Sequence, residues 1–241
     1  MEPCRSRRQR LISFSTKHNM DSQPPTKTVK KIAHPIGIRQ EHIAEEETLL
    51  YLRPRYDPHS PDEYTLKRYW DDSTIFTVTG RKYGDTRARE FRDASGLPMF
   101  ESRPTSLAWR RPLLVRLPGK EDEELVDFRM GWEGYTLKFR NAASRDEKDV
   151  TIQVQVIESM AYTEYAVIVD GQRVVDVRES LTMNKSLPTA RARAASNHSL
   201  LPRQILEVLV AENFDLSLAA LIAVHMADTK FSSFLLPRRS T

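Results

Sequence analysis

Residues 215–228 read Asp-Leu-Ser-Leu-Ala-Ala-Leu-Ile-Ala-Val-His-Met-Ala-Asp and form a compact apolar block near the C-terminus. Leucine and alanine are strong helix formers, and Asp215 is well suited to cap the start of a helix. On a helix of about 3.6 residues per turn the block shows apolar side chains on every face, and only Ser217 and His225 interrupt them. A helix that is apolar all round must be buried on all sides.

This block is too short to cross a bilayer. At about 1.5 Å per residue its apolar part reaches roughly 18 Å, against ~30 Å for the hydrocarbon core of a membrane. The sequence also has no run that approaches the roughly 18 to 20 consecutive apolar residues of a membrane span. We therefore expect the rest of the protein to surround the helix.

The sequence before the helix has the texture of an all-β domain. Short runs of β-branched, aromatic and leucine residues recur about every ten residues, with turn residues between them. They cover the ranges 48–52, 63–70, 74–79, 88–92, 97–102, 113–117, 124–130, 135–140, 150–157, 163–169, 173–178 and 204–210. Asp170-Gly171 suits a two-residue hairpin turn, and Ile152, Val154 and Val156 alternate with polar residues. Consecutive strands are therefore expected to pair antiparallel.

The apolar face of about a dozen strands has to pack on a core, and the apolar helix has to be buried on all sides. The sequence therefore predicts a mainly β fold, in which a closed antiparallel barrel surrounds a central hydrophobic C-terminal helix. Closure of the barrel also removes exposed edge strands. The stretch 180–199 has few bulky apolar residues and is interpreted as a long loop.

Composition indicates one globular domain that functions in a reducing compartment. Of the 241 residues 39% are hydrophobic and 29% are charged, which is ordinary for a globular protein. Cys4 is the one cysteine, so neither a disulfide nor a cysteine-based metal site can be built within the chain. The N-terminus lacks the apolar core of a secretory signal. We expect an intracellular monomer, in the cytoplasm or the nucleus.

The positive charge of the protein is concentrated in its N-terminal segment. Residues 1–43 hold nine basic and three acidic side chains, whereas the rest of the chain holds 28 basic and 30 acidic ones. This predicts a disordered basic tail over 1–43, a folded domain over 44–234 and a short C-terminal tail over 235–241. It does not favour nucleic-acid binding by the folded domain. The tail is interpreted as solvated, with a mitochondrial transit peptide and a nuclear-localisation patch at 5–10 as alternatives.

Two segments resemble a known family. The first is Gly80-Arg81-Lys82, followed by residues 90–100 (Glu-Phe-Arg-Asp-Ala-Ser-Gly-Leu-Pro-Met-Phe), Ser106-Leu107 and Trp109. The second is residues 214–222, Phe-Asp-Leu-Ser-Leu-Ala-Ala-Leu-Ile. Together they resemble LURP-one-related proteins, also called tubby C-terminal-like domains, over roughly residues 45–232. The loop at 180–199 and the basic tail depart from the pattern.

The resemblance implies a twelve-stranded antiparallel barrel around a central helix, shared with tubby proteins and phospholipid scramblases. Tubby domains bind phosphoinositide headgroups, and scramblases act on bilayers, but a shared fold does not carry function. A basic set beside the Gly80-Arg81-Lys82 triplet is the candidate headgroup site, because guanidinium groups suit phosphate oxygens. It consists of Arg81, Lys82, Arg87, Arg89, Arg92, Arg110 and Arg111, with Trp109. The alternative is that Arg89 and Arg92 are ordinary outward-facing strand residues paired with nearby acids.

The motifs of common catalytic sites are absent from the sequence. It contains no phosphate-binding glycine loop, nucleophile elbow, zinc motif or calcium loop. Asp71-Asp72 is interpreted as a turn, the acidic run 121–124 as a solvated loop, and His225 as a buried core histidine. We therefore expect no catalytic residues, metal or cofactor. The leading hypothesis is a binding or tethering module for anionic lipid headgroups or a protein partner. Scramblase-like bilayer activity is the alternative, and an enzyme with a ligand near His225 is the third hypothesis.

Overall fold

The structure is a computed structural model of the whole chain. It describes residues 29–55, 63–80, 88–105, 112–120, 123–132, 134–158, 163–184 and 204–230. All statements below about structure concern these ranges.

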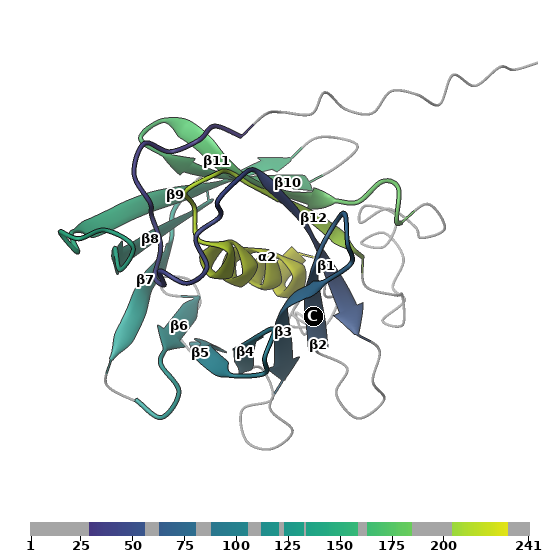
Figure 1. Cartoon of the computed structure of the whole chain (residues 1–241), viewed down its shortest axis with the longest axis horizontal. Helices are drawn as coiled ribbons and strands as arrows, with labels where there is room; N and C mark the ends of the chain where they lie inside the picture. Colours follow the sequence, from purple (N-terminus) through teal and green to yellow (C-terminus); the bar gives the residue numbers. More distant parts are fainter. Residues whose placement is uncertain are drawn as a thin grey trace, which may run out of the picture.

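Twelve strands form one closed barrel in which each strand pairs antiparallel with the next (Figure 1). The strands are β1 (Thr48–Arg55), β2 (Glu63–Arg68), β3 (Thr74–Gly80), β4 (Arg89–Asp93), β5 (Pro98–Pro104), β6 (Leu113–Arg116), β7 (Glu124–Met130), β8 (Gly134–Arg140), β9 (Asp149–Glu158), β10 (Thr163–Val169), β11 (Gln172–Glu179) and β12 (Leu206–Val210). β12 closes the barrel on β1, with Leu50 opposite Val208. Each of the twelve predicted ranges overlaps one of these strands.

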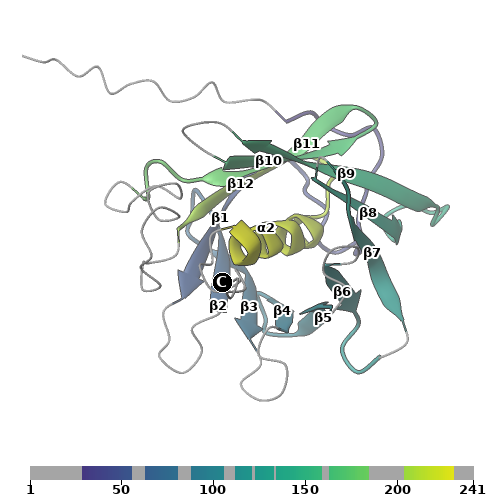
Figure 2. The same cartoon turned by 180° about the vertical axis from the view of Figure 1, so that it is seen from behind.

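Helix α2 (Leu216–Lys230) lies inside this ring, as the views from both sides show (Figures 1 and 2). Its apolar residues from Leu216 to Ala227 are all buried. They pack on inward-facing strand residues such as Phe76, Phe91 and Phe128. The prediction of a mainly β barrel around a central apolar helix is therefore confirmed.

Residues 29–47 close the barrel at the start of the helix. Ile36 and Ile38 are buried, and the backbone of Ile43 bridges to Asp215. Gly37 must be a glycine, because a Cβ there would lie 2.5 Å from the Cβ of Asp215. Residues 29–43, which the sequence assigned to the tail, thus belong to the folded body; residues 1–28 lie outside the described part. The predicted C-terminal tail, 235–241, also lies outside it.

The up-and-down order of the strands divides the connections between two rims. At one rim, the helix-start rim, lie Asp215 and the turns β2–β3, β4–β5, β6–β7, β8–β9 and β10–β11. The other rim is the helix-end rim, where α2 ends. There lie the strand ends that flank the connections β1–β2, β3–β4, β5–β6, β7–β8, β9–β10 and β11–β12. Tyr64 at the start of β2 and Arg89 at the start of β4 both reach Asp228 of α2, which fixes this assignment.

Candidate functional site

The structure describes two residues of the predicted basic site, Arg89 and Arg92. Arg89 points into the barrel. It is 7% exposed. Its Nε donates to Oδ2 of Asp228 at 3.0 Å, while the hydroxyl of Tyr64 donates to Oδ1 of the same carboxylate at 2.8 Å. Arg89 thus compensates an acid at the C-terminal end of a helix, where the helix dipole disfavours negative charge. The expectation that Arg89 lies on an exposed surface is corrected, because its charge is used inside the barrel.

Arg92 behaves as an ordinary residue of the outer wall. It pairs with Glu90 at 2.6 Å, and its guanidinium donates to the carbonyl oxygen of Gly96 at 2.8 Å. The remaining predicted site residues, Arg81, Lys82, Arg87, Arg110 and Arg111, lie outside the described residues, as does Trp109. Their segments leave and rejoin the barrel at the helix-end rim, in the neighbouring connections β3–β4 and β5–β6.

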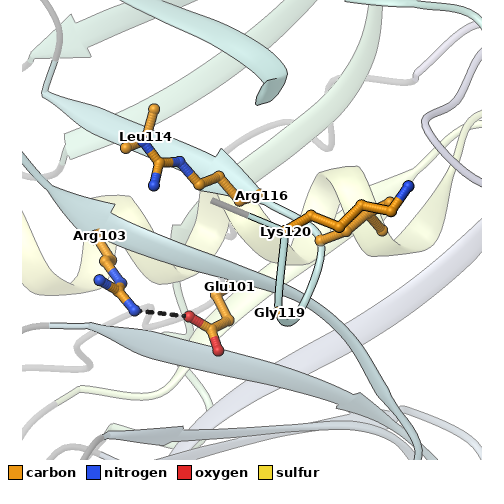
Figure 3. A pocket seen from close by; sticks show the side chains of 7 residues that line it. Glu101, Arg103, Leu114, Arg116, Gly119 and Lys120 are labelled. Carbon is orange, nitrogen blue, oxygen red and sulfur yellow. Dashed lines mark hydrogen bonds and ion pairs between the residues drawn. The ribbon is translucent and has the colours of Figure 1, made fainter. Parts of the chain in front are cut away.

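A basic groove lies on the outer wall of the β5–β6 pair (Figure 3). Its volume is about 140 Å³. β5 contributes Glu101 and Arg103, β6 contributes Leu114 and Arg116, and the following turn contributes Leu117, Gly119 and Lys120. We call this set the β5–β6 groove. Three cationic side chains therefore face one carboxylate over a partly apolar floor.

The cations of the β5–β6 groove differ in how far they are neutralised. Arg103 pairs with Glu101 at 3.2 Å, and Lys120 pairs with Glu123 at 2.7 Å. Arg116 lies opposite Glu101 and Glu124 in the strand register, yet its guanidinium forms no hydrogen bond or ion pair within the described ranges. The guanidinium of Arg116 is thus available to bind an anionic oxygen, and the guanidinium of Arg103 can donate further hydrogen bonds to the same anion.

Sequence reasoning missed the β5–β6 groove. Its members are spread from residue 101 to residue 120, and the register Arg103 to Leu114 and Glu101 to Arg116 brings them together. The sequence did contain a signal for it, since Arg103 and Arg116 both stand at positions that alternate with buried residues and therefore face outward from their strands. The pairing across the connection could not be read from the sequence alone.

His225 is enclosed by aromatic rings within the barrel. Its ring centroid lies 4.9 Å from that of Phe128 and 5.2 Å from that of Tyr135, both edge to face. Its Nε2 has no hydrogen-bond partner among the described residues. Burial lowers the pKa of His225 to about 4, so the imidazole is neutral at physiological pH. This environment is that of a core histidine.

The buried imidazole predicts a loss of stability in acid. The unfolded chain binds a proton below about 6.5 and the folded chain only below about 4, so stability is lost as the pH falls through that window. Replacing His225 with Leu should reduce the loss between about pH 7 and pH 5 by about 2 kcal/mol. Urea unfolding of both proteins at the two pH values measures it. The difference between the proteins is needed because burial raises the pKa of Asp215 to about 6, which gives the opposite slope.

An equal pH dependence in the wild type and in His225→Leu would contradict this assignment. The Leu variant should also be at least as stable as the wild type at pH 7, because it removes a buried nitrogen that lacks a partner.

The acidic candidates take part in turns and surface ion pairs. Asp71 accepts hydrogen bonds from the amide and the hydroxyl of Ser73, and Asp72 pairs with Lys67 at 2.6 Å. This confirms the prediction of a turn at Asp71-Asp72. In the part of the chain that the structure describes, no three His, Cys, Asp or Glu side chains are grouped to hold a metal ion. None of the helices described there has both the length and the apolar character to cross a membrane.

The fold defines the class of the protein as a closed twelve-stranded antiparallel barrel with its C-terminal helix inside. A protein from Arabidopsis thaliana, solved by X-ray crystallography, is similar in structure to this chain. The TM-score is 0.50 with 15% sequence identity, and the match covers 79% of this chain and 96% of that chain. At such identity the likeness shows the fold alone. No family model and no curated protein matches the sequence.

Proposed function

We propose that this protein is a non-enzymatic binding or tethering module that recognises anionic phosphoinositide headgroups at an intracellular membrane surface. The observation that carries the proposal is the β5–β6 groove, in which Arg116 faces outward without a carboxylate bound to it in the described ranges. Arginine forks bind phosphate oxygens in pairs, and a partly apolar floor suits a headgroup close to acyl chains.

The sequence also has cations in two of the connections between strands. Arg110 and Arg111 belong to the connection between β5 and β6, and Arg81, Lys82 and Arg87 to the connection between β3 and β4. Each cation near an anionic membrane surface contributes about 1 kcal/mol of attraction. Membership of the LURP-one-related or tubby-like group is part of this proposal, and the shared barrel supports it.

Two rivals are less well supported by the geometry. Scramblase-like activity that extracts α2 would break the bonds from Ile38 to Asp215 at the start of the helix and from Arg89 to Asp228 near its end. It would also expose the apolar surface of the helix at a cost of about 25 cal/mol per Å². A protein partner could use the same cations, and it would show itself as binding without lipid selectivity.

Vesicle co-sedimentation tests the proposal. Vesicles of phosphatidylcholine, alone or with phosphatidylserine or phosphatidylinositol bisphosphate, are mixed with the wild type and with Arg103→Ala/Arg116→Ala. We expect binding to phosphoinositide vesicles, and a loss of about thirtyfold in affinity in the double variant, since two cations at about 1 kcal/mol each are removed. Arg81→Ala/Lys82→Ala should lose a similar amount.

The matched control removes two cations elsewhere on the outer wall. Lys138 and Arg140 of β8 pair with Asp149 and Glu147, so Lys138→Ala/Arg140→Ala should bind as the wild type does. Equal, negligible binding of all these proteins to every vesicle would remove the lipid function. Equal losses in the control would show that the effect is one of net charge and not of a site.

A further inference from the structure

Glu101 is the one carboxylate among the described residues that line the β5–β6 groove. In Figure 3 it lies among Arg103, Arg116 and Lys120, and its Oε2 accepts from Arg103 at 3.2 Å. The side chain of Glu101 is only 14% exposed, so it is a fixed part of the groove and not a loose surface acid. A site for phosphate alone would gain nothing from this acid, because its charge repels the ligand.

The strand register fixes the place of this carboxylate beside the cations. Glu101 lies directly opposite Arg116 of β6, and Arg103 lies opposite Leu114. On one face of such a pair the Cβ atoms of opposite residues are about 4.5–5.5 Å apart, and diagonal neighbours are about 7–8 Å apart. An anion that contacts both Arg103 and Arg116 therefore has the carboxylate of Glu101 as its immediate neighbour.

The rest of the groove is partly apolar, and the backbone fixes one end of it. Leu114 and Leu117 contribute the apolar lining. The amide of Lys120 donates to the carbonyl oxygen of Leu117 at 3.1 Å, and Gly119, which follows a proline, has a φ of 76°. These features are typical of a type II turn, which holds Lys120 at the end of the groove.

The size of the groove limits what it can hold. Its volume is about 140 Å³, whereas sites that enclose a whole drug-sized ligand measure roughly 300–1,000 Å³. The groove therefore takes one phosphate group together with the edge of the ring that carries it.

A carboxylate beside phosphate-binding cations has a chemical use when the ligand carries a hydroxyl next to its phosphate. Guanidinium groups only donate, so they match phosphate oxygens and cannot accept from a hydroxyl. An ionised carboxylate only accepts, and it has about four acceptor sites. Glu101 can therefore hold Arg103 and accept from a ligand hydroxyl at the same time. The C–H groups of a polyol ring suit the leucines of the groove.

We propose that Glu101 determines the specificity of the groove by accepting a hydrogen bond from a hydroxyl adjacent to the phosphate that Arg103 and Arg116 bind. The inference rests on the proposed function and names its ligand class. That class is a phosphorylated polyol ring, as in a phosphoinositide, and not every phosphate monoester. A site that bonds a hydroxyl rejects a ligand that lacks it, because the polar group of the site then stays unpaired.

The test compares two lipids that each carry one phosphate monoester. Phosphatidylinositol 4-phosphate has a ring hydroxyl on each side of the monoester, and phosphatidic acid has none beside it. Wild type and Glu101→Ala are sedimented with phosphatidylcholine vesicles that contain an equal fraction of one lipid or the other. The preference for the phosphoinositide should fall at least about tenfold in Glu101→Ala, as expected for loss of a hydrogen bond to a charged group. Binding to phosphatidic acid should stay equal or tighten, since a repelling charge is removed.

Two further variants make the test specific. Glu90 of β4 lies directly opposite Glu101 and pairs with Arg92, and it is not among the residues that line the groove. Glu90→Ala thus removes the same charge one strand away and should keep the wild-type preference. Glu101→Gln keeps an acceptor oxygen without the charge, so its preference should lie between those of the wild type and Glu101→Ala.

A soluble headgroup separates the ligand class from the membrane. Titration calorimetry with inositol 1,4-bisphosphate should show binding by the wild type and weaker binding by Glu101→Ala. If the wild type binds this ligand in a Glu101-dependent way but binds no vesicle, the membrane function is overturned and the ligand class stands.

The lipid comparison also separates the two proposals in the other direction. A change in affinity by the same factor for both lipids would mean that Glu101 only repels anions or supports Arg103. That result overturns this inference and leaves the headgroup function in place. A wild type that binds neither the vesicles nor the soluble headgroup overturns both proposals.

Discussion

Replacing Leu221 with Asp should abolish cooperative folding. Leu221 lies in the middle of α2 and is buried among the inward-facing side chains of the barrel. An isolated carboxylate at this place would lose its hydration with no partner to compensate, which costs far more than the whole stability of a small domain. Thermal unfolding followed by circular dichroism, with size-exclusion chromatography, would show the loss of the folded monomer.

Two further variants make this prediction specific. Leu221→Ala keeps the site apolar and should cost about 2–5 kcal/mol, so it should fold with a lower melting temperature. Leu97→Asp introduces the same charge in the β4–β5 turn, where Leu97 is 65% exposed, and should melt like the wild type. A soluble Leu221→Asp protein with a cooperative transition would mean that α2 is not enclosed.

Replacing Asp215 with Ala should destabilise the protein by about 3–5 kcal/mol, since bonds to a charged group are strong and buried donors would be left without partners. The carboxylate caps α2 through Oδ1, which accepts from the amide and hydroxyl of Ser217, both at 2.7 Å. Its Oδ2 accepts from the amides of Ile38 and Arg39 at 2.9 and 3.0 Å. One buried side chain therefore joins the start of the helix to the segment that closes the barrel.

Asp215→Asn separates these two roles. Asparagine is a good helix cap, but its amide nitrogen would face the N–H groups of Ile38 and Arg39 and could not accept from them. We expect it to lose roughly half of what Asp215→Ala loses, and to increase hydrogen exchange in residues 29–47. Chemical denaturation gives the free energies. Equal stability of Asp215→Asn and the wild type would show that the contact with residues 38 and 39 contributes nothing.

The central features of the fold could be predicted from the sequence because they depend on local periodicity. The all-round apolar block at 215–228 requires enclosure, and alternation in strands such as 150–157 assigns an inner and an outer face. Boundaries were less well predicted. β2 ends at Arg68 and not at Trp70, since Tyr69 and Trp70 belong to the turn in which Asp72 has a φ of 53°.

Contacts between segments far apart in sequence could not be predicted. Arg89 lies two residues before Phe91 in β4, so its side chain points to the same inner face of the barrel. Its charge alone favours a surface position, and the buried partner that compensates this charge, Asp228, lies 139 residues further along the chain. Residues 29–43 lack a helical or strand period, because they are held by irregular contacts and not by a regular element. The amide of Gly37 donates to Oδ1 of Asn141, and the amide of Ile38 donates to Oδ2 of Asp215. The β5–β6 groove depends in the same way on strand register.

The closing strand and the enclosed helix are also the last parts of the folded body to leave the ribosome. Until β12 and α2 emerge, the first eleven strands lack the helix that fills the core. They also lack the strand that pairs with both β1 and β11 and so closes the barrel. Nascent chains in that condition expose apolar surface and unpaired strand edges, which favour aggregation. Closure of this barrel therefore has to wait until β12 and α2 have been synthesised, and the earlier strands are exposed to aggregation until then.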